Sequence, residues 1–175
     1  GSDEVVQRSK GTKAAITSGT GFAGLNLSAN GAGWPPDTNG DVGPGYYVQS
    51  VNSSVGIFDT KTRNSVSTPT LNAFFQAIFP SSNPCYKNNQ GDPVVLFDRI
   101  AQRWIVTDFN WGNMRTGPYY ECIGVSNSAD PTGYWHGFAM VADSGKQMND
   151  YPKLASTPNA ILMTANKFSG GNSYA

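Results

Sequence analysis

The chain has 175 residues, long enough to bury a hydrophobic core as one domain or as part of a larger one. Twelve basic and twelve acidic residues give a formal net charge of zero, which argues against a nucleic-acid partner because such proteins normally present a basic face. Charged residues make up only 14% of the chain, whereas glycine and proline are frequent, as is typical of short strands joined by turns. No apolar run approaches the roughly 18 residues of a membrane span, so none is expected.

Residues 1–33 are polar and rich in Gly, Ser and Thr, so we expect an N-terminal arm, partly irregular, that either pairs onto the body or stays loose. Strand patterns occupy residues 34–175. The runs 46–51 and 55–58, separated by a tight turn, predict a first hairpin. The next run has apolar residues at the i, i+3, i+4 spacing, which predicts one short helix near 71–79 that ends at Pro80.

The middle of the chain predicts four consecutive antiparallel strands, at residues 93–98, 103–109, 119–126 and 134–141. Such a set makes one β-propeller blade, whose innermost strand should be short and apolar, as Val94-Val-Leu-Phe97 is. Another hairpin is predicted over 153–157 and 160–168. We therefore expect an all-β fold, a β-propeller fragment of about two and a half four-stranded antiparallel blades. The remaining blades would come from a companion fragment or a longer parent chain.

An aspartate stands shortly before a proline and an apolar run three times. These residues are Asp41, Asp92 and Asp150, at intervals of 51 and 58 residues, the length of one blade. Two interpretations are open: each aspartate makes a turn before its strand, or the three line one mouth of the central channel. In the second case two of them could act as acid and base in glycan hydrolysis, with carboxyl groups within about 10 Å, and Tyr151 could position a substrate hydroxyl.

A tight loop carries oxygen side chains at alternate positions, on Asp37, Asn39 and Asp41, which predicts the start of a calcium site. Val48 stands where an EF-hand places its glutamate, so an EF-hand is excluded. The alternative is an Asx-rich turn that satisfies its own backbone. Trp111, in the Gly- and Asn-rich stretch 110–118, is a better candidate for stacking on a sugar than Trp104, which lies inside a predicted strand and is expected in the core.

The chain has two cysteines, Cys85 and Cys122. They could pair and close a loop of about 36 residues, which would add about 3 to 4 kcal/mol of stability. The alternative is two unpaired buried thiols, since Cys122 lies in an apolar strand pattern. The low charge and the Asn- and Gly-rich composition favour an extracellular protein and hence the disulfide.

One turn, Ser128-Ala-Asp130-Pro-Thr-Gly133-Tyr-Trp135, resembles the Asp box of sialidase-type propellers, with one extra residue before the glycine and no threonine before the tryptophan. In that family the aspartate is structural, so no chemistry is assigned to Asp130. The segments 34–44, 91–104, 128–133 and 150–152 resemble a family of secreted bacterial propellers, which implies the fold and an extracellular location. Asp92-Pro93 is similar to the inner-strand starts of five-bladed glycoside hydrolases.

Two functions follow as expectations. The first is a secreted, carbohydrate-active propeller that hydrolyses a glycan with carboxylates at the channel mouth. The second is a non-catalytic, calcium-stabilised propeller that binds a glycan or a protein at the cell surface. The position of the carboxyl groups relative to one another separates the two.

Overall fold

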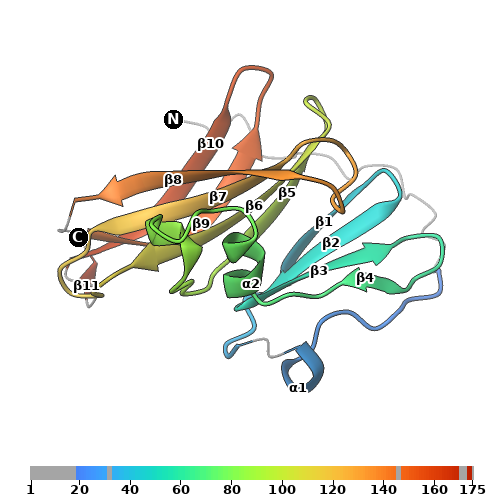
Figure 1. The fold of residues 1–175 in the computed structure, drawn as a ribbon, viewed down its shortest axis with the longest axis horizontal. Helices are drawn as coiled ribbons and strands as arrows, with labels where there is room; N and C mark the ends of the chain where they lie inside the picture. Colours follow the sequence, from blue (N-terminus) through green and yellow to red (C-terminus); the bar gives the residue numbers. More distant parts are fainter. Residues whose placement is uncertain (1–18, 31–32, 145–146, 170–172, 175) are drawn as a thin grey trace, which may run out of the picture.

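The computed structural model describes residues 19–30, 33–144, 147–169 and 173–174. It is mostly β, with three antiparallel sheets that follow one another along the chain (Figure 1). The prediction of an all-β fold built from successive antiparallel sheets is therefore confirmed. Among the helices of the described residues, none is long and apolar enough to cross a membrane.

The first sheet has four strands in sequence order: β1 (Asn39–Gly43), β2 (Tyr46–Val51), β3 (Ser54–Asp59) and β4 (Ser65–Ser67). The β2–β3 hairpin was predicted, whereas β1 was not. Its sequence Asn-Gly-Asp-Val-Gly is poor in the β-branched and aromatic residues that favour strands. It is extended because its backbone pairs with β2 from Asn39 opposite Ser50 to Gly43 opposite Tyr46. The prediction that Asp41 precedes the first strand of this sheet is therefore wrong, since Asp41 lies inside β1.

The second sheet also has four strands in sequence order: β5 (Val94–Asp98), β6 (Arg103–Trp111), β7 (Tyr119–Ser126) and β8 (Trp135–Asp143). All four were predicted, with ends within two residues of those observed. Four of the five residues of β5 are buried, as expected of a short apolar strand covered on both faces.

The third sheet comprises β9 (Gln147–Ser156), β10 (Ile161–Ser169) and β11 (Ser173–Tyr174), in the order β11-β10-β9. The predicted hairpin is present, but β9 begins earlier, so Asp150 lies within the strand and not ahead of it. The register with β10 shifts between Thr164 and Asn166, opposite Tyr151-Pro152, and Tyr151 has a φ of +49°. This irregularity admits a proline that cannot donate to the ladder.

The helix α2 (Leu71–Gln76) lies between the first two sheets (Figure 1). Its N-cap is Thr70, whose side chain accepts a hydrogen bond from the Ala73 N–H. It is shorter than the predicted 71–79, because the chain continues in turns before Pro80. Two short elements were not predicted, the four-residue α1 (Leu27–Asn30) and the 3-10 helix η1 (Pro84–Tyr86).

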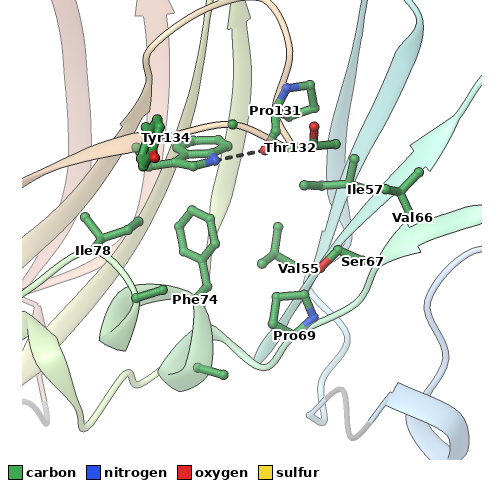
Figure 2. Close-up of a pocket in the computed structure, with 14 residues that line it drawn as sticks. Val55, Ile57, Val66, Ser67, Pro69, Phe74, Ile78, Pro131, Thr132 and Tyr134 are labelled. Atoms are coloured by element: carbon green, nitrogen blue, oxygen red, sulfur yellow. Dashed lines mark hydrogen bonds between the residues drawn. The ribbon is translucent and has the colours of Figure 1, made fainter.

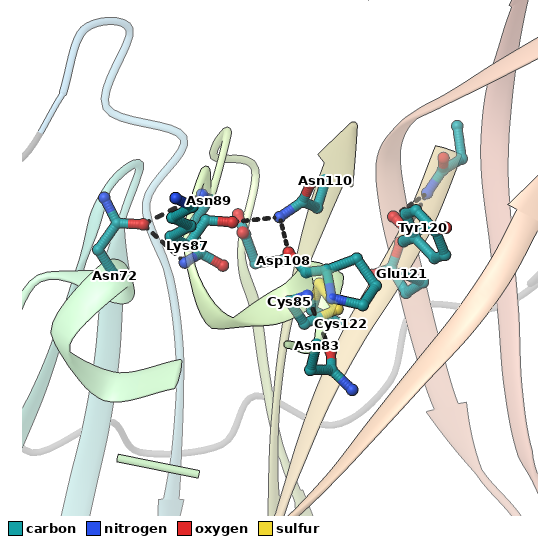
Figure 3. Close-up of a disulfide and its surroundings, with 12 residues drawn as sticks. Asn72, Asn83, Cys85, Lys87, Asn89, Asp108, Asn110, Tyr120, Glu121 and Cys122 are labelled. Carbon is teal, nitrogen blue, oxygen red and sulfur yellow. Dashed lines mark hydrogen bonds between the residues drawn. A yellow bond between two sulfur atoms is a disulfide. The ribbon is translucent and has the colours of Figure 1, made fainter. Parts of the chain in front are cut away.

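The main core lies between the first and second sheets and includes residues of α2. Its largest buried members include Phe75 from the helix and Trp104 from β6. The predicted disulfide is confirmed: Cys85 of η1 bonds to Cys122 of β7, and both residues are fully buried (Figure 3). It therefore ties the connection after α2 to the second sheet.

Most of the predicted N-terminal arm, residues 1–18, lies outside the described residues. The part that is described packs on the first sheet. The Phe22 ring lies 5.6 Å from that of Phe58, and the Leu25 N–H donates a hydrogen bond to Gln49. This part of the arm is thus paired onto the body.

Candidate functional site

The first strands of neighbouring sheets lie side by side, β1 beside β5 and β5 beside β9. Side chains of β1 bond the backbone of β5 at alternate positions. The Val95 N–H donates to Asn39 Oδ1 at 2.7 Å, and the Phe97 N–H donates to Asp41 Oδ2 at 2.9 Å. Two of the three predicted calcium ligands, Asn39 and Asp41, therefore satisfy free amides of β5 and hold the two sheets together.

Asp41 is further engaged by a cation. The Arg99 guanidinium donates to its carboxylate at 2.9 Å, and the Val42 N–H donates at 2.8 Å. Partial burial alone would raise the pKa of Asp41, but the hydrogen bonds from Arg99, Phe97 and Val42 outweigh burial and hold this pKa below its ordinary value. We call this arrangement around Asn39, Asp41 and Arg99 the β1–β5 junction.

The structure brings together a different trio of carboxyl groups. Asp92 makes side-chain hydrogen bonds with both Asp150 and Asp37. Asp37 and Asp92 each stand two residues before the first strand of their sheet, and both have positive φ, +38° and +49°. Aspartate tolerates this conformation better than most residues. Asp37 therefore occupies the position that the sequence pattern gave to Asp41, and we call Asp37, Asp92 and Asp150 the acidic cluster.

Asp41 itself lies away from this cluster. It is alongside Phe97, three residues beyond the first residue of β5, which is about 10 Å along the strand, and Asp92 precedes that strand. The expectation that Asp41, Asp92 and Asp150 converge is therefore met by Asp92 and Asp150 and not by Asp41.

Crowding of carboxyl groups changes the chemistry of Asp92. Burial, followed by the hydrogen bond with Asp150, the charge of Asp150 and the proximity of Asp37, raises the pKa of Asp92 to about 7. The carboxyl group of Asp92 therefore takes up a proton near neutral pH, and not in the acid range that is usual for aspartate. Asn52 supports the cluster, since its side-chain N–H donates to Asp37 Oδ2 at 3.2 Å.

Two more carboxyl groups, those of Asp108 and Glu121, lie in the second sheet near the disulfide (Figure 3). Asp108 of β6 is fully buried: its Oδ1 accepts from the Gly91 N–H at 2.8 Å, and its Oδ2 has no partner. Glu121 of β7 is also fully buried and accepts from Asn149 Nδ2 at 2.8 Å. Burial raises the pKa of Asp108 well above its ordinary value and that of Glu121 to about 7.

Neither Asp108 nor Glu121 was predicted from the sequence as a site residue. A signal was present for Asp108, because an ionisable residue stands within a strand whose middle is otherwise buried and largely apolar. Nothing in the spacing indicates that it lies against the turn that carries Asp92.

Two aromatic side chains near cluster residues are exposed. Tyr151 follows Asp150 and is 48% exposed, and the Lys153 ammonium lies 3.1 Å from its ring centroid. Trp34, three residues before Asp37, is 83% exposed and was not singled out from the sequence. The predicted sugar platform Trp111 is instead the last residue of β6, half-buried, with its ring stacked on Phe109 at 4.9 Å.

A groove of about 550 Å³ lies elsewhere, between β3, β4, α2 and the turn 131–135 (Figure 2). In this turn Asp130 accepts from the Thr132 N–H, and Trp135 Nε1 donates to the Pro131 carbonyl. The groove is lined mainly by apolar side chains such as Phe74 and Ile78, and its lining contains no Asp, Glu, His, Lys or Arg. It offers no acid, base or charge, so the acidic cluster is the better candidate site.

The three predicted calcium ligands have different partners. Asp37 belongs to the acidic cluster, whereas Asn39 and Asp41 belong to the β1–β5 junction. Across the described residues, no group of three or more His, Cys, Asp and Glu side chains is arranged to hold a metal ion. Calcium binding stays a prediction from the sequence pattern.

Comparison with known proteins gives no relative from which a function could be transferred. No protein-family model, no curated protein and no solved structure matches the chain. A function must therefore be argued from the site itself, in which Asp150 and Asp37 lie close to Asp92.

Proposed function

We propose that this chain is part of a secreted β-propeller and that its three sheets are successive blades. Two four-stranded sheets in sequence order, with their first strands side by side, support this arrangement. The buried disulfide supports an oxidising, extracellular location. The remaining blades would be supplied by a longer parent chain or a companion fragment.

The function that the site supports best is binding of a glycan at the mouth of the channel. The observation that carries it is the proximity of Asp150 and Asp37 to Asp92, whose pKa they raise, together with the exposure of Tyr151, the residue that follows Asp150 in the chain. Carboxyl oxygens accept hydrogen bonds from sugar hydroxyl groups, and an exposed aromatic ring packs on the apolar face of a sugar. Trp34 adds a second exposed ring on the segment that leads to Asp37.

Hydrolysis is the alternative. Retaining glycosidases need about 5 to 5.5 Å between their two carboxyl groups, and inverting enzymes about 6.5 to 9.5 Å. Asp92 and Asp150 are the pair that would have to meet this requirement, since Asp150 lies close enough to raise the pKa of Asp92.

The test is a panel of soluble polysaccharides, assayed for retention in affinity electrophoresis and for release of reducing ends. We expect retention of the protein by at least one glycan without release of reducing ends. Asp92→Asn and Tyr151→Ala should abolish the retention. Tyr134→Ala, which removes an 85% exposed tyrosine from the groove of Figure 2, should leave it unchanged.

Two outcomes would contradict the proposal. Retention that is equally strong in the Asp92 and Tyr151 variants would place binding outside the mouth. Release of reducing ends that depends on Asp92 would favour the hydrolase instead. Calcium is tested in the same assay by adding millimolar CaCl₂ or a chelator, since extracellular calcium sites bind in that concentration range.

A further inference from the structure

We propose that Glu121 makes the contact between the second and third sheets dependent on pH: the neutral side chain holds β9 against β7, and its ionisation lets the β9–β10 hairpin open away from the second sheet. This device goes beyond the proposed function, since it concerns how the third sheet is held and not what the mouth binds. It is supported by the position of Glu121, by the unpaired oxygens around it and by the way the third sheet is attached.

Glu121 lies between the two sheets. Successive residues of a strand point to opposite faces, so Glu121 and Cys122 point in opposite directions from β7. Cys122 bonds to Cys85 in the main core, whereas Glu121 Oε2 accepts a hydrogen bond from Asn149 Nδ2 of β9 at 2.8 Å. Glu121 is fully enclosed and Asn149 is 1% exposed. The strand β9 therefore helps to keep water away from the Glu121 carboxyl group.

Three buried side-chain oxygens at this contact have no hydrogen-bond partner: Glu121 Oε1, Asn149 Oδ1 and Thr107 Oγ1. Thr107 of β6 points to the same face as Glu121, since it pairs with the residue two positions after Glu121 in β7. An amide oxygen only accepts hydrogen bonds, and so does an ionised carboxylate, so the charged form of Glu121 offers Asn149 Oδ1 no donor. The neutral acid carries one O–H group, and a proton on Oε1 supplies a donor where these acceptors lack one.

The charged groups around Glu121 do not neutralise it. The Lys167 ammonium of β10 favours the carboxylate, but it donates to the Ala142 carbonyl at 3.2 Å. Asp108 of β6 points to the other face of the sheet, and burial together with the charge of Glu121 raises its pKa. Met140, which lies opposite Glu121 on β8, is uncharged. An ionised Glu121 therefore has no ion-pair partner at this contact among the described residues.

The third sheet is attached outside the main core. That core is formed by the first two sheets, α2 and η1, and among the described residues none of its members belongs to β9 or β10. The strand β9 lies beside β5, β7 and β8, and side-chain hydrogen bonds join the third sheet to the second at Asn149 and Lys167. A unit outside the main core can open while the rest of the domain stays folded.

Ionisation and opening are therefore coupled. Burial raises the pKa of Glu121 to about 7 in the closed structure, although neighbouring side chains favour the carboxylate, and exposure to water would return this pKa towards 4.5. The closed structure holds the proton more tightly, so the closed form is favoured below pH 4.5 and opening becomes easier as the pH rises to about 7. Because Asp150 belongs to β9, opening also moves it away from Asp92.

The test is hydrogen–deuterium exchange of the full chain at pH 5 and pH 8, read by mass spectrometry and corrected for the intrinsic effect of pH on exchange. We expect the protection of β9–β10 peptides to fall at least about tenfold at pH 8, with an upper limit of about 70-fold for pKa values of about 7 and 4.5. At pH 8 these peptides should be at least about tenfold less protected than those of the β2–β3 hairpin, which belongs to the first sheet.

Two variants assign the effect. Glu121→Gln keeps the shape of the side chain but does not ionise, and it should reduce the fall in protection to severalfold at most. Asp92→Asn tests the competing group, because Asp92 also has a raised pKa and lies near Asp150 of β9. The fall should remain at least about tenfold in that variant. Circular dichroism of each variant checks that it is folded.

A third variant serves if Glu121→Gln does not fold. Lys167→Met removes the charge that favours the Glu121 carboxylate, so the loss of protection should continue to a higher pH than in the wild type.

Four results would overturn the proposal. The first is a protection of β9–β10 that is equal at pH 5 and pH 8. The second is a loss of protection that reaches the same level in β2–β3, because the chain then unfolds as a whole. The third is a fall that persists in full in Glu121→Gln, and the fourth is a fall that Asp92→Asn alone removes.

Discussion

The β1–β5 junction and the acidic cluster are built from the same sequence motif and differ in almost every electrostatic respect. Asp41 accepts hydrogen bonds from two backbone N–H groups and a guanidinium, and its pKa is lowered. Asp92 meets two other carboxyl groups, and its pKa is raised to about 7. The motif therefore does not determine the pKa of its aspartate: the surrounding donors and charges lower it at Asp41 and raise it at Asp92.

Among the substitutions that test this contrast, the largest change in the free energy of unfolding is expected at Glu121, a buried residue of β7. Its pKa of about 7 in the folded protein lies above its ordinary 4.5, so the folded state holds this proton more tightly than the unfolded state. The stability contributed by this group is present below pH 4.5 and is lost as the pH rises towards 7. Glu121→Gln should therefore raise the free energy of unfolding at pH 8 by up to about 3 kcal/mol, measured by denaturant titration.

The same measurement at pH 4 is the control for Glu121, since the wild-type side chain is then protonated and the variant should gain little. A variant that is no more stable than the wild type at pH 8 would show that neighbouring groups, such as Asn149 and Lys167, fully compensate the charge of the buried carboxylate.

The next largest effect is expected at the junction, with the opposite sign. Asp41→Ala leaves the Phe97 N–H without its acceptor and removes the partner of Arg99. We expect a loss of about 1 to 3 kcal/mol in the free energy of unfolding at pH 7. Because the pKa of Asp41 is lowered on folding, its contribution is present above about pH 4 and fades as the pH falls through its lowered folded pKa. An equal loss at pH 2 and pH 7 would contradict the assignment.

Asp92→Asn separates the two interpretations that the sequence left open. Asparagine makes the same turns as aspartate and tolerates the same positive φ, so if Asp92 only makes a turn, the substitution should leave the free energy of unfolding nearly unchanged. Removing one charge from the acidic cluster should instead stabilise the protein at pH 8, by about 1 kcal/mol once solvent screening is allowed for. A rise of about 2 to 4 °C in Tm together with lost glycan binding would identify a functional cluster that reduces stability. An unchanged Tm would favour the turn.

The smallest effect is expected for Arg99→Met. The Arg99 side chain is 64% exposed, and exposed ion pairs contribute about 0.2 to 1 kcal/mol. The backbone hydrogen bond to Asp41 Oδ2 remains in this variant. A loss as large as that of Asp41→Ala would mean that the ion pair, and not the bond to β5, holds the junction.

Much of the fold could be predicted from the sequence, because the signals are local. The four strands of the second sheet alternate or run apolar between turn residues, so their ends were predicted within two residues. Cys85 and Cys122 are the only two cysteines, so a disulfide could join only that pair. The strand β1 was missed because its residues are typical of turns and it is extended by pairing with β2, while its side chains bond the backbone of β5.

The sequence by itself determined the periodic aspartates and two members of the acidic cluster, Asp92 and Asp150. The tertiary structure decided the rest. Asp37 takes the place expected for Asp41 because β1 begins at Asn39, two residues after Asp37. Asp108 lies near Asp92 because its position on β6 lets it accept a hydrogen bond from the Gly91 N–H. Which carboxyl groups meet depends on strands more than 50 residues apart lying side by side, as the bonds from Val95 to Asn39 and from Phe97 to Asp41 show, and no local spacing encodes that contact.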